Sequence, residues 1–403
     1  MTLVIRGKSV VTNANTVSQQ GVTFDALGCI ADGAVVCEAG RVAWTGSVDR
    51  LPREYRAAQL HEYPQCAVMP GFVDAHAHPL FAGNREPDFA ARQRGETPHL
   101  GMLYTVAQTR KALEHPDVFW ARVQARLRLM AAHGTTTLET KTGYALHKPG
   151  EMELLSLIDA HRDEQGLPRL IATFLGAHAL PPEFRSEIDY VDYLIDQCLP
   201  VAKAHGAIYA DAFCEPGFFS PEQTRRYLEA ARARGLRLRV HCDEMAYGGA
   251  AQAAVQIGVD AVDHCNCIRD SDAAAIAGTQ TVMVACPATI AYLDLPQRAP
   301  VRDLLERGGR VALASDYNPG TSPCFNLQTV AYFGRKLFGL SAAEAFYGIT
   351  IAAAKSLRID AGTLREGASA DIAIVGVDSL EEIGWQFGGN LARAVYRKGM
   401  PLA

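Results

Sequence analysis

The chain lacks any apolar run approaching the roughly 20 residues that a membrane span needs. It also lacks a basic run interleaved with aromatic residues, and its formal charge is −5, from 39 Lys and Arg against 44 Asp and Glu. Neither a membrane nor nucleic acid is therefore an expected partner. The N-terminus, MTLVIRGKSV, has no long apolar core followed by a small-residue cleavage site, so we expect a cytoplasmic protein.

The ten cysteines include no C-x-x-C pair, the spacing typical of a zinc clip or a redox motif. Most of them stand inside apolar runs such as VMVACPA, and we interpret them as small buried hydrophobic residues. Cys242 and Cys265 each follow a histidine, and in a strand their side chains would point away from it. We therefore expect neither a metal-bound nor a nucleophilic cysteine.

The 403 residues are long for one compact domain, so a large domain with a smaller one is expected. The N-terminal segment reads as short strands and turns, with a hairpin pattern around Glu38-Ala39-Gly40. The chain becomes β-like again near its C-terminal end. Residues 1–66 and 360–403 are therefore predicted to form one small sheet domain together, and residues 67–359 the large domain.

In the large domain, apolar strand-like runs alternate with helical patterns, which is the signature of repeated β-α units. One such unit begins a helix at Ser220, with Gln223 in the capping-box position, and ends it at Gly235. Candidate strands lie at 67–73, 135–140, 170–178, 208–214, 236–240, 261–265, 281–286 and 310–316. Eight strands with helices between them predict an α/β fold, a (β/α)8 TIM barrel.

Functional side chains of such barrels lie at the C-terminal ends of the strands. The stretch VDAHAHPLFAG puts His76 and His78 two residues apart at the end of the first strand, where both face the same side. The other strand ends add Glu139 to Lys141, His178, His241 with Glu244, His264, and Asp316. Three nitrogen ligands, an oxygen ligand and an open position suit a catalytic zinc or a similar divalent ion, which lowers the pKa of a bound water to about 7.

Each of these residues also has an ordinary structural interpretation. The two histidines of HAH could flank a surface turn, and His264 could be a core histidine with a satisfied hydrogen bond. Asp316 could cap a helix, and Glu244 could face solvent. These alternatives weaken together, because each must be invoked separately at the same rim of the barrel.

The elements VDAHAH, HCDE, DH and SD resemble the metal-dependent amidohydrolase superfamily, in which hydrolases and deaminases share this pattern. The longer segments PGFVDAHAHPLFAGNRE, GTTTLETKTGYAL, TFLGAHALPP, VDHC and ASDYNPGTSP are similar to those of the imidazolonepropionases, over nearly the whole chain. The resemblance implies a distorted (β/α)8 barrel with a small β-sandwich built from both chain ends. It also implies an enzyme of histidine degradation, which hydrolyses the cyclic amide of 4-imidazolone-5-propanoate to N-formimino-L-glutamate.

The resemblance further implies one divalent ion, zinc in the first place and iron as the alternative. The implied metal ligands are His76, His78, His241 and Asp316. The implied substrate contacts are Arg85, Tyr144, His178, Asn318, Gly320 and Thr321, and the implied catalytic pair is Glu244 and His264. A planar guanidinium such as Arg85 suits a propionate carboxylate by bidentate pairing, although a surface salt bridge is its ordinary alternative.

In the mechanism that this family implies, Asp316 also serves as the general base. His264 polarises the ring carbonyl, and Glu244 carries a proton to the leaving nitrogen. Lys141 is either structural or carbamylated, and the structural role is favoured because a site with one metal ion does not need a bridging ligand.

The chain departs from the family after FAARQRGE, where TPHLGMLYTV is shorter and has Pro98 in place of an expected tyrosine. His99 or Tyr104 could replace that tyrosine, or the pocket could admit a different ring. A paralogue acting on a thio-oxo imidazolidine propionate or on an N-methylated imidazolone is thus one alternative. A heterocycle deaminase is a second, which Arg85 disfavours because a neutral nucleobase has no carboxylate.

A third alternative is a metal-free structural protein of the same fold, against which the complete set of ligands argues. The expected partner is a small molecule with a carboxylate arm. The sequence does not define the oligomeric state, for which a homodimer is the commonest solution.

Overall fold

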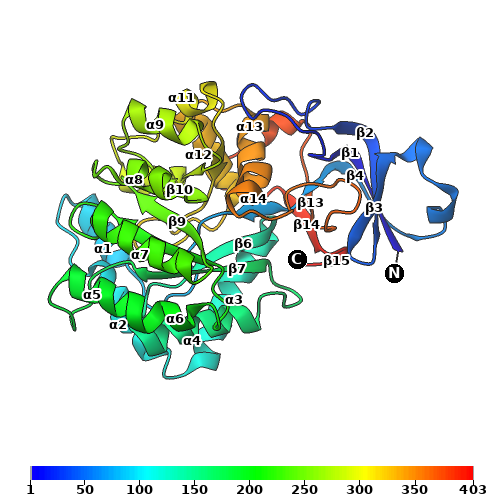
Figure 1. Ribbon diagram of the computed structural model, residues 1–403. Helices are drawn as coiled ribbons and strands as arrows, with labels where there is room; N and C mark the ends of the chain where they lie inside the picture. Colours follow the sequence, from blue (N-terminus) through cyan, green and yellow to red (C-terminus); the bar gives the residue numbers. More distant parts are fainter. Residues whose placement is uncertain (1, 403) are drawn as a thin grey trace.

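The computed structural model describes residues 2–402, which form a helix-covered barrel and a small sheet beside it (Figure 1). Both ends of the chain lie on the side of the small sheet. This sheet has the strand order β15-β14-β13-β4-β1-β2-β3. Its strands are β1 (Thr2–Val11), β2 (Cys29–Glu38), β3 (Arg41–Ser47), β4 (Gln59–Pro70), β13 (Ile372–Val375), β14 (Ala392–Arg397) and β15 (Met400–Pro401).

The predicted hairpin around Glu38-Ala39-Gly40 is confirmed. Strands β2 and β3 pair in antiparallel register, with Glu38 opposite Arg41. Ala39 and Gly40 both have left-handed backbones, with φ of 49° and 78°. Two such residues in succession give the tight turn whose twist matches that of the flanking strands.

The barrel contains eight neighbouring parallel strands in sequence order. They are β5 (Phe72–Asp74), β6 (Thr135–Lys141), β7 (Arg169–Ala177), β8 (Tyr209–Cys214), β9 (Arg237–Cys242), β10 (Ala261–His264), β11 (Val282–Ala285) and β12 (Val311–Leu313). An isolated parallel bridge between Ala77 and Tyr317 joins the ends of β5 and β12. The predicted TIM barrel and small β-sandwich domain are thus confirmed, with the strands of the small domain in one continuous sheet.

Helices surround the barrel and cover its strands (Figure 1). They are α1 (Glu86–Gln93), α2 (Gly101–Ala112), α3 (Pro116–Ala132), α4 (Lys148–Ala160), α5 (Glu187–Tyr193), α6 (Leu199–Ala202), α7 (Pro221–Ala233), α8 (Ala250–Ile257), α9 (Asp270–Ala277), α10 (Pro287–Leu293), α11 (Val301–Glu306), α12 (Leu327–Phe338), α13 (Ala342–Tyr347) and α14 (Ala353–Ser356). Five-residue π-helical turns, Leu194–Cys198 and Gly348–Ala352, follow α5 and α13. The predicted capping box at Ser220 and Gln223 is present at the start of α7. Within residues 2–402, no helix has the length and apolar character of a membrane span.

The first predicted strand, at 67–73, is wrong, because it consists of parts of two strands. Strand β4 continues to Pro70 in the small sheet, and only Phe72–Asp74 belongs to the barrel. Between them, the Gly71 amide donates to the Asp371 carbonyl at 2.8 Å. The run CAVMPGFV is buried from Cys66 onward, so its apolar character does not reveal the change of sheet. Strand β4 also crosses the proposed domain border at 66/67, and the domain limits stay a prediction.

Replacement of Gly71 by Ala tests how closely the two domains meet at this change of sheet. A Cβ at Gly71 would lie 2.2 Å from Oγ1 of the buried Thr136. We expect Gly71→Ala to lower the free energy of unfolding by about 1–3 kcal/mol, as overpacking does. Gly278→Ala is the control, because its Cβ would meet only backbone oxygens at 3.6 Å. Denaturant titration measures both, and equal stabilities would contradict the close fit.

Candidate active site

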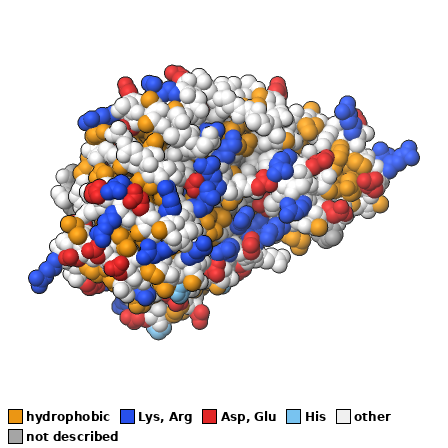
Figure 2. Space-filling view, viewed as in Figure 1, with side chains coloured by type: hydrophobic (Ala, Val, Ile, Leu, Met, Phe, Trp, Pro, Cys, Tyr) orange, Lys and Arg blue, Asp and Glu red, His pale blue; other side chains and the backbone are white. Residues whose placement is uncertain are grey.

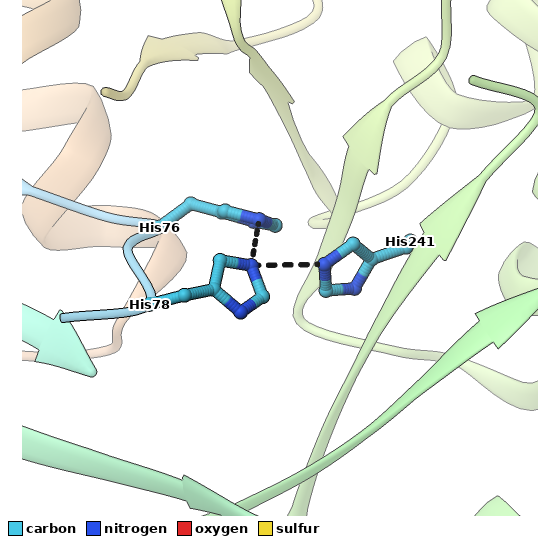
Figure 3. A group of neighbouring side chains, drawn as sticks. All are labelled: His76, His78 and His241. Carbon is cyan, nitrogen blue, oxygen red and sulfur yellow. Dashed lines mark hydrogen bonds between the residues drawn. The ribbon is translucent and has the colours of Figure 1, made fainter. Parts of the chain in front are cut away.

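His76, His78 and His241 point toward one another at the C-terminal end of the barrel strands (Figure 3). The Nε2 atom of His78 lies 3.2 Å from Nε2 of His76 and 3.4 Å from Nε2 of His241. Oδ1 of Asp316 is 3.4 Å from Nε2 of His76 and 3.5 Å from Nε2 of His78. The structure therefore brings together the four side chains that the sequence singled out as metal ligands.

Closure of the barrel fixes the backbone of the His-Ala-His segment. Strand β5 ends at Asp74, and the next residues pair with the chain that follows β12. The Asp316 amide donates to the His76 carbonyl at 2.9 Å, and the His78 amide donates to the Tyr317 carbonyl at 2.9 Å. The same contacts that close the barrel thus set the distance between Asp316 and the two histidines.

Buried carboxylates orient two of the histidine rings. Nδ1 of His76 lies 2.7 Å from Oδ2 of Asp263, and Nδ1 of His241 lies 3.1 Å from Oδ1 of Asp211. A carboxylate at Nδ1 holds the ring proton there and leaves the Nε2 lone pair free for a metal ion. Neither carboxylate was among the residues predicted from the sequence.

Two buried cations stand behind these carboxylates. The Lys141 ammonium donates to Asp211 at 2.7 Å and to Glu139 at 2.9 Å, and the Arg239 guanidinium donates to Asp263 at 3.0 and 3.1 Å. Burial and Arg239 act to lower the pKa of Lys141, but the carboxylates outweigh them and raise it. A lysine held in this way as a cation supports the structural interpretation of Lys141.

The histidines and Asp316 fit a divalent metal ion. Burial is the main cause that lowers the pKa of His76 and His78 well below the usual value, so both rings are neutral. The Nε2 atoms of the three rings and an Asp316 oxygen lie close together, with contacts of 3.2–3.5 Å. Three nitrogens with one oxygen in this arrangement suit zinc-like ions.

Glu244 and His264 lie beside this centre, both buried. Their ligand atoms and one of Asp316 are all within 4.8 Å of one another. Nδ1 of His264 is 3.6 Å from Oε1 of Glu244, which is too long for a hydrogen bond, so this nitrogen has no hydrogen-bond partner among residues 2–402. Burial, followed by Asp316 and Glu215, raises the pKa of Glu244 well above its usual value.

The backbone is strained at the strand ends that carry these groups. Asp243, His264, Cys265 and Asp316 all have positive φ, between 49° and 69°. A residue other than glycine in this region costs about 1–3 kcal/mol, and such residues cluster at functional sites. The left-handed backbone conformation turns His264 and Asp316 out of the strand direction and toward the centre of the rim.

A cavity of about 220 Å³ opens above the histidines. Apolar side chains form much of its wall, namely Met102, Phe213, Phe218 and Met245. The polar residues of the wall are His78, Arg85, Tyr144, His178, His241, Glu244, His264, Asp316, Asn318 and Thr321. The cavity therefore combines apolar surfaces for a ring with polar groups of both charge signs.

Arg85 enters the cavity at a fixed orientation. Its Nε donates to the buried Asp88 carboxylate at 2.9 Å. A Cβ at Gly320 would lie 2.1 Å from Nη1 of Arg85, so only glycine leaves room for the guanidinium. Arg92 donates to the Gly320 carbonyl at 3.0 Å and holds that turn in place. Within residues 2–402, no hydrogen bond engages the two Nη atoms of Arg85, which leaves them free for a ligand.

The other predicted contact residues also surround the cavity. The Nδ1–H of His178 donates to the Gly143 carbonyl at 2.9 Å, and the His178 ring stacks on His78 with centroids 5.4 Å apart. Burial raises the pKa of Tyr144, which keeps its hydroxyl protonated. Oδ1 of Asn318 accepts from the Gly320 and Thr321 amides at 2.8 Å each, so Asn318 shapes the turn as well as the wall.

The short loop after Glu96 places Met102 in the wall, and neither His99 nor Tyr104 is among the described lining residues. The Asp88 carboxylate accepts from the backbone amides of His99, Leu100 and Gly101 at 2.9–3.2 Å and so fixes this loop. Asp88 was not predicted from the sequence. Its position three residues after Arg85, on the same helical turn, was the available signal.

Glu215 is a second residue that sequence reasoning missed. It directly follows β8, and its carboxylate accepts from the amides of Glu244, Met245 and Ala246 at 2.7–2.9 Å. This holds the segment that carries Glu244. A reading of the strand end AFCE in the same way as the histidine-bearing ends would have found it.

Comparison with known proteins identifies the family. Residues 67–395 match the model of the amidohydrolase family. The imidazolonepropionase of Bdellovibrio bacteriovorus is 35 % identical, with 97 % of this chain and 94 % of that protein covered. The chain belongs to the imidazolonepropionase family. The imidazolonepropionase of Ralstonia nicotianae is 37 % identical, with 94 % of each chain covered.

Solved structures support the fold of this imidazolonepropionase family member. A triazine hydrolase variant superposes with a TM-score of 0.75 at 18 % identity, covering all of this chain and 94 % of that one. The E. coli guanine deaminase superposes with a TM-score of 0.72 at 20 % identity, covering all of this chain and 99 % of that one. At these identities the likeness shows the fold alone.

Removal of the charge on Asp211 tests its role in orienting His241. Asp211→Asn should weaken zinc affinity about 10- to 100-fold, because an amide holds the Nδ1 proton less strongly. Titration of the zinc-loaded protein with a competing chelator measures the change. Asp49→Asn is the matched control, because Asp49 is exposed and precedes the barrel strands in the chain. An unchanged affinity in Asp211→Asn would contradict the role given to this carboxylate.

Proposed function

We propose that the protein is an imidazolonepropionase that hydrolyses 4-imidazolone-5-propanoate to N-formimino-L-glutamate with one divalent metal ion, zinc in the first place. The observation that carries the proposal is the Arg85 guanidinium, which lines the same cavity as His78, His241 and Asp316 and has no hydrogen bond at its two Nη atoms within residues 2–402. A fork of N–H donors suits a carboxylate arm, and the four donor atoms suit the metal ion that activates water. Membership of the family supports the same reaction.

Hydrolysis joins a water oxygen to the ring carbonyl carbon, breaks the bond between that carbon and a ring nitrogen, and adds a proton to the nitrogen. A bound divalent ion would supply Lewis acidity and would lower the pKa of a water molecule bound to it to about 7. His76, His78, His241 and Asp316 would hold the ion. The remaining work, which consists of moving protons and binding the substrate, falls to side chains of this chain.

We assign the proton transfers to groups that already lie within reach of one another. Asp316 accepts the proton of the attacking water, and Glu244, whose pKa is raised by burial, gives a proton to the leaving ring nitrogen. His264 donates to the carbonyl oxygen as negative charge develops on it. A preorganised donor of this kind typically contributes roughly 3 kcal/mol.

Arg85, Tyr144 and His178 are assigned to the substrate. Arg85 pairs with the propionate, while Tyr144 and His178 offer a hydroxyl and a ring nitrogen to the polar edge of the heterocycle. Phe213 and Met102 cover its faces. The arrangement also argues against a purine deaminase. A neutral nucleobase has no carboxylate, so the Nη atoms of Arg85 would remain without an acceptor when it binds.

Replacement of Arg85 separates binding of the carboxylate from the chemistry. Arg85→Ala should raise KM for imidazolone propionate roughly 10- to 100-fold, because a charge-assisted pair is lost. Turnover of an imidazolone without the propionate arm should be the same in both proteins. Arg225→Ala, which removes two exposed ion pairs on α7, is the control. An unchanged KM in Arg85→Ala would remove the reason for assigning this substrate.

Turnover of imidazolone propionate itself tests the proposed reaction. Imidazolone propionate is generated in the cuvette from urocanate by urocanase. The zinc-loaded protein is then added, and the loss of the ultraviolet band of imidazolone propionate is followed. The thio-oxo and N-methyl analogues are compared at equal concentration. We expect fast loss with the plain imidazolone and little with the analogues. A clear preference for an analogue would mean that the shortened loop before Met102 has changed the substrate that the pocket accepts.

A further inference from the structure

A second cleft lies at the opposite end of the barrel, where the small sheet packs against the starts of the barrel strands. Its volume is about 720 Å³, which is in the range of small-molecule sites. The small sheet contributes the turns around Arg41 and Lys398, and the barrel contributes Arg169 at the start of β7 and residues 358–360 after α14. Both domains therefore build this cleft.

Cationic side chains dominate the walls of the cleft. Figure 2 shows Lys and Arg side chains gathered along the seam between the barrel and the small sheet. The cations that line the cleft are Arg41, Arg169, Arg358, Arg397 and Lys398. This concentration contrasts with the formal charge of −5 of the whole chain, so the cleft is a local positive region.

The three carboxylates in the walls already have partners, some of them among the cations of the cleft itself. Asp163 is shared by Arg397 and Lys398, at 3.4 and 3.3 Å. Asp360 pairs with Arg365. Arg358 pairs with Asp260 at 2.8 Å, so among residues 2–402 the lining cations without an ion pair are Arg41 and Arg169.

The third carboxylate, Asp371, is also engaged. It accepts from the Ser369 hydroxyl and from the Lys398 amide, each at 2.8 Å. Within residues 2–402, no hydrogen bond or ion pair engages the half-buried Arg169 guanidinium. A planar fork of N–H groups that is partly desolvated and has no acceptor is a recognition element for phosphate or carboxylate oxygens.

We propose that this cleft binds a small multivalent anion of the phosphate type, with Arg169 as its main anchor. Arg41 and Lys398 reach the same ligand from the small sheet. The two domains are already joined here by Arg397, whose Nη2 donates to the Asp163 and Glu164 carbonyls at 2.7 and 2.9 Å. An anion held from both sides adds to this contact, so its binding raises the temperature of unfolding. The proposal is independent of the chemistry assigned to the barrel rim.

Calorimetric titration of the zinc-loaded full chain tests the proposal, with inorganic phosphate and adenosine monophosphate as probes. Chloride keeps the ionic strength constant, so that general screening does not imitate binding. We expect saturable binding of one phosphate per chain and a rise in the unfolding temperature. Tighter binding of adenosine monophosphate would identify a nucleotide as the source of the phosphate group, and equal binding would identify free phosphate.

Variants locate the binding. Arg169→Ala should weaken phosphate binding at least tenfold, and Arg169→Lys should give an intermediate affinity because it keeps the charge and loses the fork. Arg85→Ala and Arg225→Ala should bind phosphate as the parent does. The proposal is overturned by the absence of saturable binding, by equal affinity in Arg169→Ala, or by a loss confined to Arg85→Ala, which would place the anion in the barrel rim.

Discussion

Buried charge behind the histidines is the constraint on which the site depends. Lys141 and Arg239 supply two positive charges, and Glu139, Asp211 and Asp263 supply three negative ones, which leaves −1 when all are ionised. Burying this many charges is tolerated only when each is paired and hydrogen-bonded. Asp263 and Asp211 accept hydrogen bonds from Nδ1 of His76 and His241, which makes the Nε2 atoms of these rings more electron-rich. A cation at that point completes the balance, so the interior of the barrel and the metal centre form one electrostatic unit.

Different parts of the structure position the metal ligands and the residues that contact the substrate. Closure of the barrel and the charges behind it fix the histidines and Asp316. The segment from α1 to α2 acts separately, because Asp88 in α1 fixes Arg85 and the loop backbone that leads to Met102. Changes in this loop can therefore reshape the substrate pocket while the metal ligands keep their positions. This explains how a chain with Pro98 in a shortened loop retains an intact set of ligand side chains.

The convergence of the four ligand side chains could be predicted, because it depends on local rules. His76 and His78 share a side through the two-residue period, and the C-terminal ends of barrel strands meet at one rim. Asp88 and Glu215 stand at positions that a sequence reading can reach, but their roles could not be predicted, since these depend on backbone amides that other segments bring to them. The change of sheet at Gly71 was also hidden, because burial on both sides makes two strands look like one.

X-ray absorption at the zinc edge of the zinc-loaded protein tests the central claim, that His76, His78, His241 and Asp316 hold the metal. The account predicts a first shell of nitrogen and oxygen at about 2.0–2.2 Å, with outer-shell scattering from imidazole rings. Cys286 offers the competing arrangement, because its sulfur lies within 4.8 Å of ligand atoms of His76 and His264. A sulfur neighbour at about 2.3 Å would contradict the account, since the metal would then occupy a different site.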